Sequence, residues 1–537
     1  MRSSAGLLLT GFSLIMMLIA ACFQSVPGYM DSEYYFADAI QLVQNGKMTE
    51  PFLWNYLDDP SGIPHPSFTY WMPLPSIMAA AGMLLFGNLS FFAARFFAII
   101  AASILPFLVY TLSKKIGANQ SVAFTAGFLA IFSGYYAIFY TLTDSFPFLM
   151  IFSCAFFLIA FDESLFGKPG WKRYFGYLVT GILIGLMHLL RADGLLWLMG
   201  GVGILVWRIR CDFRKSQSNK KTKLILQYIQ YLIIVIIGYV AVTFWWYGRN
   251  LSEWGKLLPP GGSLTIWLTS YNQTFSYPAN KLNSSAWLAS GWREIIGIRL
   301  NAIFQNLKTF FGVQMQIFMC PFVFIGAWKL RKEPRILFGF FMWLAIFGIM
   351  SIVFPFAGVR GGFFHSGAAI QPLFWSVFPI GFFSAIQWGA RKRKWRSATA
   401  QKVFTFGFLC IAVLMTAVLF IGRVVTPSGN RAWDYSNQQY LKVDEILKDL
   451  NVANDAIVMV NNPPGFYLAT GRKSIVIPNG NIENLISVAR NYDAEIVVLE
   501  SNHPDELDDL YRAPAQISSM QLLTSSGNIH IFRVPGE

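Results

Sequence analysis

The chain has 537 residues, of which 55% are hydrophobic, 17% aromatic and only 13% charged. A soluble protein of this length needs far more charge to cover its surface, so the composition excludes a soluble enzyme and predicts a polytopic membrane protein. The net charge of +14 does not indicate nucleic-acid binding, because most Lys and Arg residues lie in short runs between hydrophobic segments.

Hydrophobic windows of roughly 17–22 residues predict about eleven membrane-spanning helices. The windows lie at residues 6–25, 91–113, 120–141, 145–162, 174–190, 194–207, 225–246, 309–328, 336–355, 372–389 and 403–422. A further apolar stretch at 73–87 is only fifteen residues long and ends in Gly87. This shorter stretch predicts an interfacial helix that lies on the membrane.

The basic runs between these windows predict the orientation of the chain. With the N-terminus in the cytoplasm, every strongly basic loop falls on the cytoplasmic side, namely residues 114–115, 168–173, 208–223, 329–335 and 391–396. Such one-sided placement of Lys and Arg is a strong topology signal. The regions expected outside the cytoplasm are 26–90, 135–144, 247–308, 356–371 and the tail after residue 423.

The five cysteines show no CxxC spacing, so the sequence predicts neither a zinc site nor a disulfide framework. Residues 19–22 resemble a lipoprotein processing site that ends in Cys22. Cleavage there would leave the remaining topology unchanged. A first spanning helix is the simpler interpretation, because Arg2 alone is a weak positively charged N-terminal region.

An acidic, aromatic segment follows the first hydrophobic window and reads Met30-Asp31-Ser32-Glu33-Tyr34-Tyr35. Membrane proteins seldom place carboxylates beside a hydrophobic span unless the polar groups have a function there. A carboxylate beside an apolar wall has a raised pKa and is a better base, which favours Asp31 as a general base. The alternative is that Asp31 caps an outer-loop helix, and that Glu33 is an ordinary acid of its first turn.

Other polar residues stand where the predicted outer loops meet the membrane. Asp144 precedes the window at 145–162, and it either functions or merely begins a helix. Arg191 and Asp193 interrupt the hydrophobic stretch between two windows, and they either contact substrate or pair with each other.

The loop at 356–371 contains the run Arg360-Gly361-Gly362-Phe363-Phe364-His365. The guanidinium group of Arg binds two phosphate oxygens at once, and glycine allows the backbone to approach a ligand closely. The run therefore indicates either a phosphate contact or a plain hairpin between two helices. His65, which precedes Pro66 in the first outer loop, is either a ligand or part of a turn.

The region from about residue 430 onward changes character, because charge rises and short apolar strand patterns appear. Strands are predicted at 456–460, 474–477 and 495–499, with helices near 436–450, 482–492 and 504–511. A final hairpin is expected around 526–528, with a last strand at 529–534. Strands that alternate with helices predict a small α/β domain.

The order of these motifs resembles the glycosyltransferase-C superfamily, near the group of protein O-mannosyltransferases and lipid A aminoarabinose transferases. The residues that carry the resemblance are Asp31 in a long first outer loop, HPSFTYW at 65–71, Leu85-Phe86-Gly87, Ala94-Arg95, Thr143-Asp144-Ser145 and His188 to Gly194. The resemblance covers residues 1–200 best. Where many members have Glu directly after the loop Asp, this chain has Ser32, and His65 stands where the aminoarabinose enzymes have Lys.

The resemblance implies a transferase that takes a sugar from a polyprenyl-phosphate carrier and gives it to a lipid, glycan or protein on the extracytoplasmic side of the cell membrane. It implies a catalytic membrane domain over 1–425, and the strand pattern and the basic loops predict an extracytoplasmic α/β domain over 426–537. A transporter or flippase of lipid-linked sugar is the alternative. A transporter, however, should carry ionisable groups near the middle of the membrane, whereas the acids here gather at one face. A membrane scaffold whose tail binds partners would leave the outer-loop acids unexplained.

The residues assigned from sequence fall into three roles. The assigned residues are Asp31, Asp144 and Glu33 for catalysis, Arg191, Arg360, His365 and His65 for the donor phosphate, and Tyr34, Tyr35, Tyr70, Trp71 and Asp193 for other substrate contacts. No metal ligand is assigned. A divalent cation such as Mg²⁺ or Mn²⁺ stays an alternative, because paired carboxylates such as Asp58 and Asp59 suit hard cations.

Overall fold

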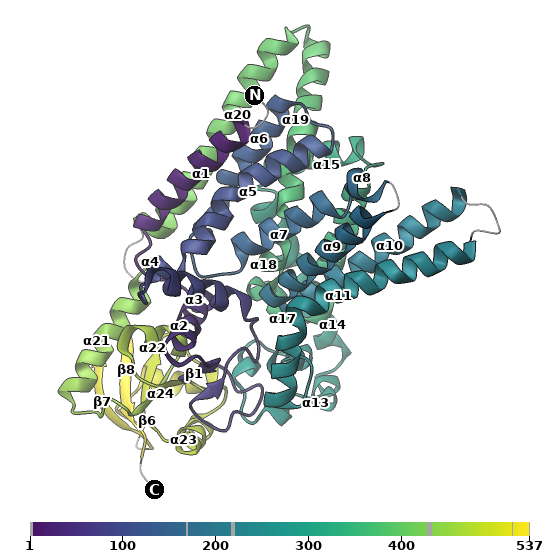
Figure 1. Cartoon of the computed structure of the whole chain (residues 1–537). Coiled ribbons are helices and arrows are strands. Elements are labelled where there is room, and N and C mark those ends of the chain that lie inside the picture. The colour runs from purple at the N-terminus through teal and green to yellow at the C-terminus, as the bar shows by residue number, and fades with distance from the viewer. Residues whose placement is uncertain (1–3, 168–169, 216–220, 427–431, 518, 536–537) are drawn as a thin grey trace.

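The computed structural model describes residues 4–535 apart from 168–169, 216–220, 427–431 and 518. Parts of two predicted basic loops lie outside the described residues, as does part of the predicted connection between the two domains. A bundle of helices forms most of the molecule, and a smaller sheet region near the C-terminus packs against its lower end in Figure 1.

Eight helices are long and apolar enough to cross a membrane, which confirms a multi-pass membrane protein. They are α1 (Ser4–Cys22), α5 (Phe96–Lys115), α9 (Trp171–Leu190), α10 (Leu195–Lys215), α11 (Lys221–Trp254), α16 (Pro334–Gly348), α19 (Gln371–Arg393) and α20 (Ser397–Phe420). Each coincides with a predicted window. The apolar helix of α16 continues through the adjoining turn to Val353, and that of α20 continues to Val425. The loop between α19 and α20, which contains the basic run 391–396, lies at the opposite end of the molecule from the C-terminal sheet (Figure 1).

Three predicted windows form shorter helices, α6 (Gln120–Ile131), α7 (Phe146–Ile159) and α15 (Cys320–Lys329). At about 1.5 Å per residue these are shorter than the roughly 30 Å of a bilayer core. The window at 309–328 is interrupted for a local reason, because Gln316 and Ile317 take positive φ angles, 46° and 58°, just before α15 begins. The count of eleven spans therefore stays a prediction. The apolar stretch at 73–87 forms a helix, α3 (Leu74–Phe86), and its interfacial position stays a prediction.

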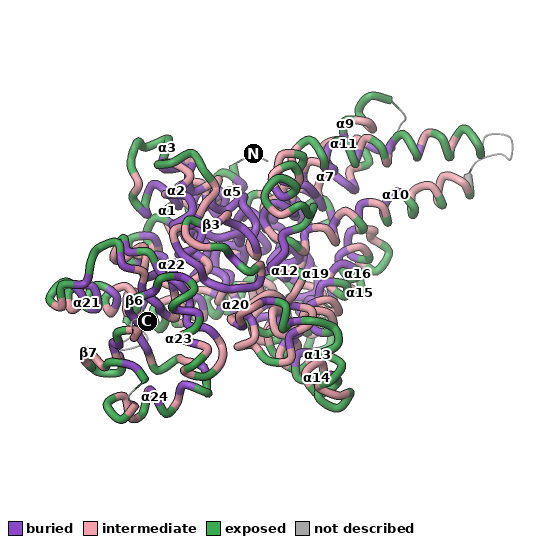
Figure 2. Tube along the Cα trace, turned by 90° about the horizontal axis from the view of Figure 1, so that it is seen from below, coloured by how far each residue is buried: buried purple, intermediate pink, exposed green. Residues whose placement is uncertain are grey.

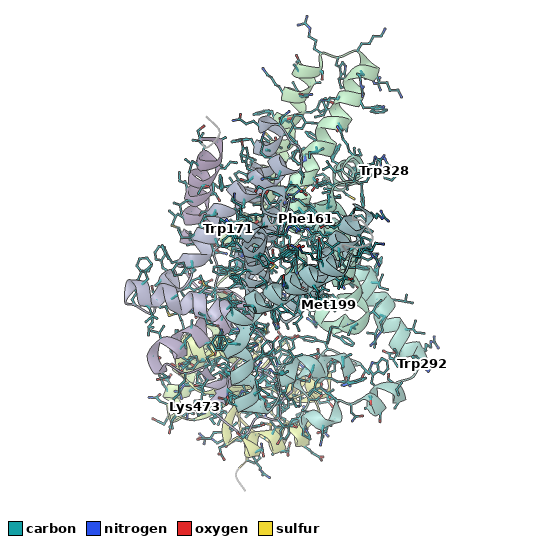
Figure 3. The ribbon with its side chains drawn as sticks, turned by 45° about the vertical axis from the view of Figure 1, so that its right-hand side comes forward. Phe161, Trp171, Met199, Trp292, Trp328 and Lys473 are labelled. Atoms are coloured by element: carbon teal, nitrogen blue, oxygen red, sulfur yellow. The ribbon has the colours of Figure 1, made fainter. Side chains whose placement is uncertain are left out.

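The surface of the bundle is apolar, as expected for helices that face lipid. Trp171, Met199 and Trp328 each expose more than two thirds of their surface, at 71%, 72% and 73%, and they lie on the outside of the bundle (Figure 3). Buried residues concentrate in the middle of the molecule, whereas the projecting parts of α10 and α11 are mostly intermediate or exposed (Figure 2).

Short elements connect these helices. The segments between the long helices contain α2 (Met30–Asn45), α4 (Phe91–Ala94), α12 (Pro260–Leu264), α13 (Ser284–Ala289), α14 (Trp292–Thr309), α17 (Pro355–Ala357) and α18 (Phe363–Gly367), and α8 (Glu163–Phe166) follows α7. Single turns of 3-10 or π-helix occur at Gly134–Phe139, Ala192–Gly194, Thr265–Trp267, Asn272–Phe275, Ala279–Lys281, Phe310–Gln314, Ile349–Val353, Gly358–Gly362, Ile421–Val425 and Asp505–Leu507.

The C-terminal region is a small α/β unit, as predicted. Its own strands are β4 (Ile457–Val460), β5 (Ser474–Val476), β6 (Ala494–Glu500), β7 (Gln521–Ser526) and β8 (Ile529–Arg533). Its helices are α21 (Tyr435–Asp449), α22 (Pro463–Thr470), α23 (Ile482–Asn491) and α24 (Asp508–Arg512). Strands β4, β5 and β6 pair in parallel, and the predicted hairpin of β7 and β8 adds to β6 in antiparallel fashion.

The sheet is completed by the first outer loop. Strand β2 (Phe52–Leu53) pairs in parallel with β5, so the order of the six strands is β2-β5-β4-β6-β8-β7. The hydroxyl of Tyr492 donates to the carbonyl of Pro60 at 2.7 Å, and the indole of Trp433 donates to the carbonyl of Val26 at 2.8 Å. The same loop has its own small ladder of β1 (Thr49–Glu50) and β3 (His65–Pro66). The C-terminal unit and the first loop are therefore one structural piece.

Candidate active site

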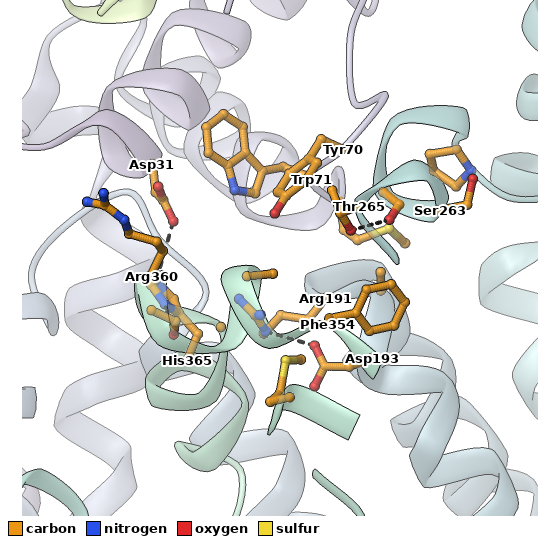
Figure 4. Close-up of a pocket in the computed structure, with 18 of the residues that line it drawn as sticks. Asp31, Tyr70, Trp71, Arg191, Asp193, Ser263, Thr265, Phe354, Arg360 and His365 are labelled. Carbon is orange, nitrogen blue, oxygen red and sulfur yellow. Dashed lines mark hydrogen bonds and ion pairs between the residues drawn. The ribbon is translucent and has the colours of Figure 1, made fainter. Parts of the chain in front are cut away.

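A cavity of about 440 Å³ opens among the outer segments. Its walls come from the start of α2, the end of the first outer loop, the break between α9 and α10, the loop around residues 258–274, and residues 349–365. Eight of the residues assigned from sequence line it, namely Asp31, Tyr35, Tyr70, Trp71, Arg191, Asp193, Arg360 and His365 (Figure 4). Polar residues from distant parts of the chain thus meet in one place.

Asp31 is the acid that faces the cavity. It lies in the first turn of α2, whose N-cap position is Tyr29 with no side-chain cap, so Asp31 does not cap the helix. Its side chain remains 28% exposed. Burial raises the pKa of Asp31 to about 6, with the nearby charge of Asp144 acting in the same direction and His365 and Arg191 opposing it. Asp31 is therefore a reachable carboxylate with increased basicity.

His365, in α18, joins Asp31 to Asp144. Its Nε2 atom lies 3.6 Å from an oxygen of Asp31 and 3.3 Å from an oxygen of Asp144. Its Nδ1 atom lies 3.0 Å from the carbonyl oxygen of Gly361 and must carry a proton there, because a carbonyl only accepts. Burial acts to lower the pKa of His365, but the charge and hydrogen bond of Asp144, together with the charge of Asp31, raise the pKa above its usual value. We therefore describe this group as an imidazolium held between two carboxylates.

Asp144 is hidden from the cavity, with only 1% of its side chain exposed. It accepts hydrogen bonds from the hydroxyls of Tyr29 and Ser145 and from the backbone N–H of Ser145. Although burial acts to raise the pKa of Asp144, His365 and these donors hold it below the usual value. Asp144 consequently orients His365 rather than touching a ligand in the cavity.

Two guanidinium groups reach the same cavity. Arg191 donates from Nε to Asp193 at 3.0 Å, so the predicted pairing of these two residues exists inside the cavity wall. The guanidinium carbon of Arg360 lies 4.0 Å from the centre of the Tyr271 ring. Within the described chain Arg360 makes no hydrogen bond to protein, which leaves its donors available. It is followed by Gly361, whose φ of 120° favours glycine.

Four residues assigned from sequence do not line the cavity, namely Asp144, described above, and Glu33, Tyr34 and His65. Glu33 is 5% exposed and its carboxylate accepts from Asn462 at 2.7 Å. Tyr34 is buried, and its hydroxyl accepts from the backbone N–H of Phe68 at 2.7 Å. The catalytic role assigned to Glu33 and the substrate role assigned to Tyr34 find no support in this placement, because neighbouring positions of a helix face different sides.

His65 also lies away from the cavity. Its two ring nitrogens lie 3.3 Å from Glu50 and 2.9 Å from Asp58. Burial would lower the pKa of His65, but hydrogen bonds to Asp58 and Glu50 raise it to about 10. With both nitrogens engaged, His65 cannot bind a phosphate in the cavity. Asp59 instead accepts from the backbone N–H of Ala279 at 2.6 Å, so Asp58 and Asp59 do not form the paired carboxylates considered above.

The cavity also contains residues that the sequence did not single out. Trp54 stacks on Trp71, with ring centroids 4.1 Å apart and planes 21° apart, and both rings line the cavity. Tyr271, Ser263 and Thr265 come from the long loop after α11. No spacing in the sequence marks these residues, because loop folding alone brings them to the cavity.

One cluster of possible metal ligands occurs in the described residues, and it consists of the two carboxylates and the imidazole described above. Asp31, Asp144 and His365 each offer a ligand atom, and these atoms lie within 4.8 Å of one another. One imidazole with two carboxylates suits Mn²⁺ or Zn²⁺ better than Mg²⁺.

Comparisons with known proteins agree with this architecture. A family described as dolichyl-phosphate-mannose-protein mannosyltransferase matches residues 65–246. ArnT from Cupriavidus metallidurans, solved with undecaprenyl phosphate, superposes with a TM-score of 0.55 at 12% identity and covers 98% of both chains. The archaeal oligosaccharyltransferase AglB from Archaeoglobus fulgidus, solved with an inhibitory peptide and a dolichol-phosphate, gives 0.53 at 10% identity, over 93% of this chain and 69% of its own.

The Archaeoglobus fulgidus oligosaccharyltransferase solved with Zn and sulfate gives a TM-score of 0.55 at 12% identity, over 91% of this chain and 67% of its own. No curated protein sequence matches the chain. The resemblance seen in the order of the sequence motifs is thus confirmed by the fold. The chain is a multi-pass membrane protein with the glycosyltransferase-C fold.

Proposed function

We propose that the chain is a glycosyltransferase that moves a sugar from a polyprenyl-phosphate donor to an acceptor hydroxyl of a lipid, glycan or protein. One observation carries the proposal: the cavity brings a reachable carboxylate of raised pKa together with Arg191, Arg360 and His365. The proteins of similar fold support it, since ArnT was solved with undecaprenyl phosphate and AglB with a dolichol-phosphate.

The reaction needs a base and a cationic surface. The bond between the sugar's anomeric carbon and the phosphate oxygen breaks, its electron pair stays with the phosphate, and the acceptor oxygen forms the new bond to that carbon. We assign Asp31 to take the acceptor's proton, because it is the accessible acid of the pair. Arg191 and Arg360 stabilise the phosphate as it gains charge, because guanidinium groups make strong hydrogen bonds to phosphate oxygens.

We also propose how the two ends of the donor lie. Apolar side chains of Leu195, Leu196, Ile349, Met350 and Phe354 line the cavity and suit the first units of a polyprenyl chain. Phe354 is labelled in Figure 4. The rings of Trp71, Tyr70 and Trp54 provide flat faces and polar edges for a sugar. We place this cavity and the C-terminal unit on the extracytoplasmic side, because every strongly basic loop is expected on the other side.

A pH profile tests the proposal and the role of Asp31 together. Purified protein in detergent should release polyprenyl phosphate from a polyprenyl-phosphate sugar when an acceptor is present. Because the pKa of Asp31 is raised to about 6, the base is ionised above that pH and protonated below it. We therefore expect kcat/KM to be constant above about pH 7 and to fall about tenfold per pH unit below pH 6. An acid limb near the ordinary value of about 4 would contradict the assignment.

A divalent cation is the alternative occupant of the trio of Asp31, Asp144 and His365. Bound there, a cation would supply positive charge beside the departing phosphate. We expect the protonated ring of His365 to supply that charge, so prolonged treatment with EDTA should change the transfer rate less than about threefold. Loss of activity that Mn²⁺ or Zn²⁺ restores would assign the trio to a metal. Elemental analysis of the purified protein gives an independent readout.

A further inference from the structure

Helix α2 uses two faces for two different contacts. Residues four positions apart lie on the same face of a helix, and residues two apart point to nearly opposite sides. Asp31 and Tyr35 both line the cavity. Glu33 and Gln41, eight positions apart, both contact the C-terminal unit, at Asn462 and Tyr467. The helix that bears the proposed base is therefore held from behind by a part of the chain more than 400 residues away.

Both ends of the Asn462 amide group make hydrogen bonds, and together they fix its orientation toward Glu33. The oxygen of Asn462 accepts from the backbone N–H of Gly465 at 3.3 Å and caps the start of α22. The nitrogen of the same amide donates to Glu33 at 2.7 Å. Because the cap fixes which end of the amide faces α22, the donating end is directed at the carboxylate. A second bond, from Gln41 to the hydroxyl of Tyr467 at 2.6 Å, holds the next part of the same face.

The packing at this contact is close. A Cβ atom on Gly465 would lie 2.6 Å from the amide nitrogen of Asn462 and 2.8 Å from a carboxylate oxygen of Glu33, so a larger residue there would displace the two side chains of this contact. Glu33 is 5% exposed and has no place in the cavity. Burial raises its pKa to about 7, although the hydrogen bond from Asn462 opposes the shift. A carboxylate buried in this way costs stability, so its position suggests a role other than stability.

We propose that the C-terminal unit is a working part of the transferase, in which Asn462 is a positioning residue that sets α2, and with it the carboxylate of Asp31, through Glu33. This inference rests on the proposed function. It assigns a task to a unit whose described residues do not line the cavity. The addition of β2 to the sheet supports it, because the same loop is anchored to the same unit at a second place.

The test variant replaces the donating NH₂ group of Asn462 and keeps the oxygen that caps α22. Asn462→Asp keeps an oxygen that can cap α22 but places a second carboxylate against Glu33. We expect kcat to fall about tenfold or more, while KM for the donor changes less than about threefold, since misplacing a reacting group lowers the rate more than binding. Combining Asn462→Asp with Glu33→Gln restores a donor and an acceptor, and it should recover most of the lost kcat.

Asn481→Asp is the matched control, because Asn481 caps α23 of the same unit and is exposed, away from α2. It should leave kcat unchanged. A fall in kcat that tracks a lower melting temperature and is not rescued by Glu33→Gln would reduce the contact to a structural one. Unchanged kcat in Asn462→Asp would overturn the inference outright.

A measurement that needs no turnover separates this inference from the proposed function. Amide hydrogen exchange over residues 30–45 should become faster in Asn462→Asp, slow again in the double variant, and stay unchanged in Asn481→Asp. Unchanged exchange in α2 would refute the positioning role even if the unmutated protein transferred no sugar. Failure of the unmutated protein to use any polyprenyl-phosphate sugar would refute the proposed function instead.

Discussion

Replacing Asp31 by Asn is expected to lower turnover by about 10²–10⁴-fold, because the amide keeps the size of the side chain but cannot accept the acceptor's proton. No other carboxylate in the cavity can substitute. Asp144 is 1% exposed and committed to His365, Tyr29 and Ser145, while Asp193 is paired with Arg191. The measurement is single-turnover transfer from a polyprenyl-phosphate sugar, which isolates the chemical step from product release.

The control for this variant is Asp59→Asn in the same outer loop. Asp59 is exposed and accepts a hydrogen bond from the backbone N–H of Ala279, which an amide oxygen can still accept. This control should keep the normal rate and melting temperature. Asp31→Asn should also keep the melting temperature, or raise it slightly, because it removes a desolvated carboxylate. Near-normal transfer by folded Asp31→Asn protein would remove Asp31 from the role of base.

The sequence predicted the C-terminal unit well because its signals are local. The runs at 457–460 and 494–500 are short and rich in β-branched apolar residues, and a Gly-Asn turn precedes the last strand. The extra strand β2 escaped prediction because two residues carry no periodic pattern, and its partner β5 is about 420 residues further along the chain. Pairing over such a distance is decided by packing and not by local preference.

The candidate site was predictable to the extent that polar residues interrupt hydrophobic stretches on one side of the membrane. Asp31, Arg191, Arg360 and His365 all meet that description, and all line the cavity. The sequence did not predict the direction in which each side chain points. Glu33 lies two positions from Asp31 and so points away from it, toward Asn462. The two carboxylates that contact His65 are those of Glu50 and Asp58, and no sequence motif predicts that pairing.

Glu33 and His65 share a physical feature that distinguishes structural residues from residues that can contact a substrate. Both are buried ionisable groups whose polar atoms are taken by protein partners, whereas Asp31 keeps an exposed oxygen and Arg360 keeps free donors in the described structure. A phosphate or hydroxyl can compete for a group only if its hydrogen-bonding capacity is not already used. This distinction narrows the residues that we propose as donor-phosphate contacts to Arg191, Arg360 and His365.

The loss of both arginines, in Arg191→Ala combined with Arg360→Ala, should abolish the preference of the protein for polyprenyl phosphate over the free polyprenyl alcohol. A hydrogen bond to a charged group contributes about 1.5–3 kcal/mol, which corresponds to about 10- to 100-fold in affinity. Arg360→Ala alone should therefore weaken phosphate binding about tenfold. Arg191→Ala should weaken it at least as much, because it also leaves Asp193 as an unpaired negative charge beside the phosphate.

Arg299→Ala provides the matched control for the arginine variants. Arg299 lies in α14 of the outer loops with its guanidinium carbon 5.1 Å from the ring of Trp287, much as Arg360 lies over Tyr271, but it does not line the cavity. The control should therefore bind polyprenyl phosphate as the unmutated protein does. Binding is measured for phosphate and alcohol of equal chain length, so the apolar contribution of the polyprenyl chain cancels. Equal binding of the two ligands by the unmutated protein would contradict the donor site, since a cavity that holds two guanidinium groups and an imidazolium must discriminate a phosphate from a neutral hydroxyl.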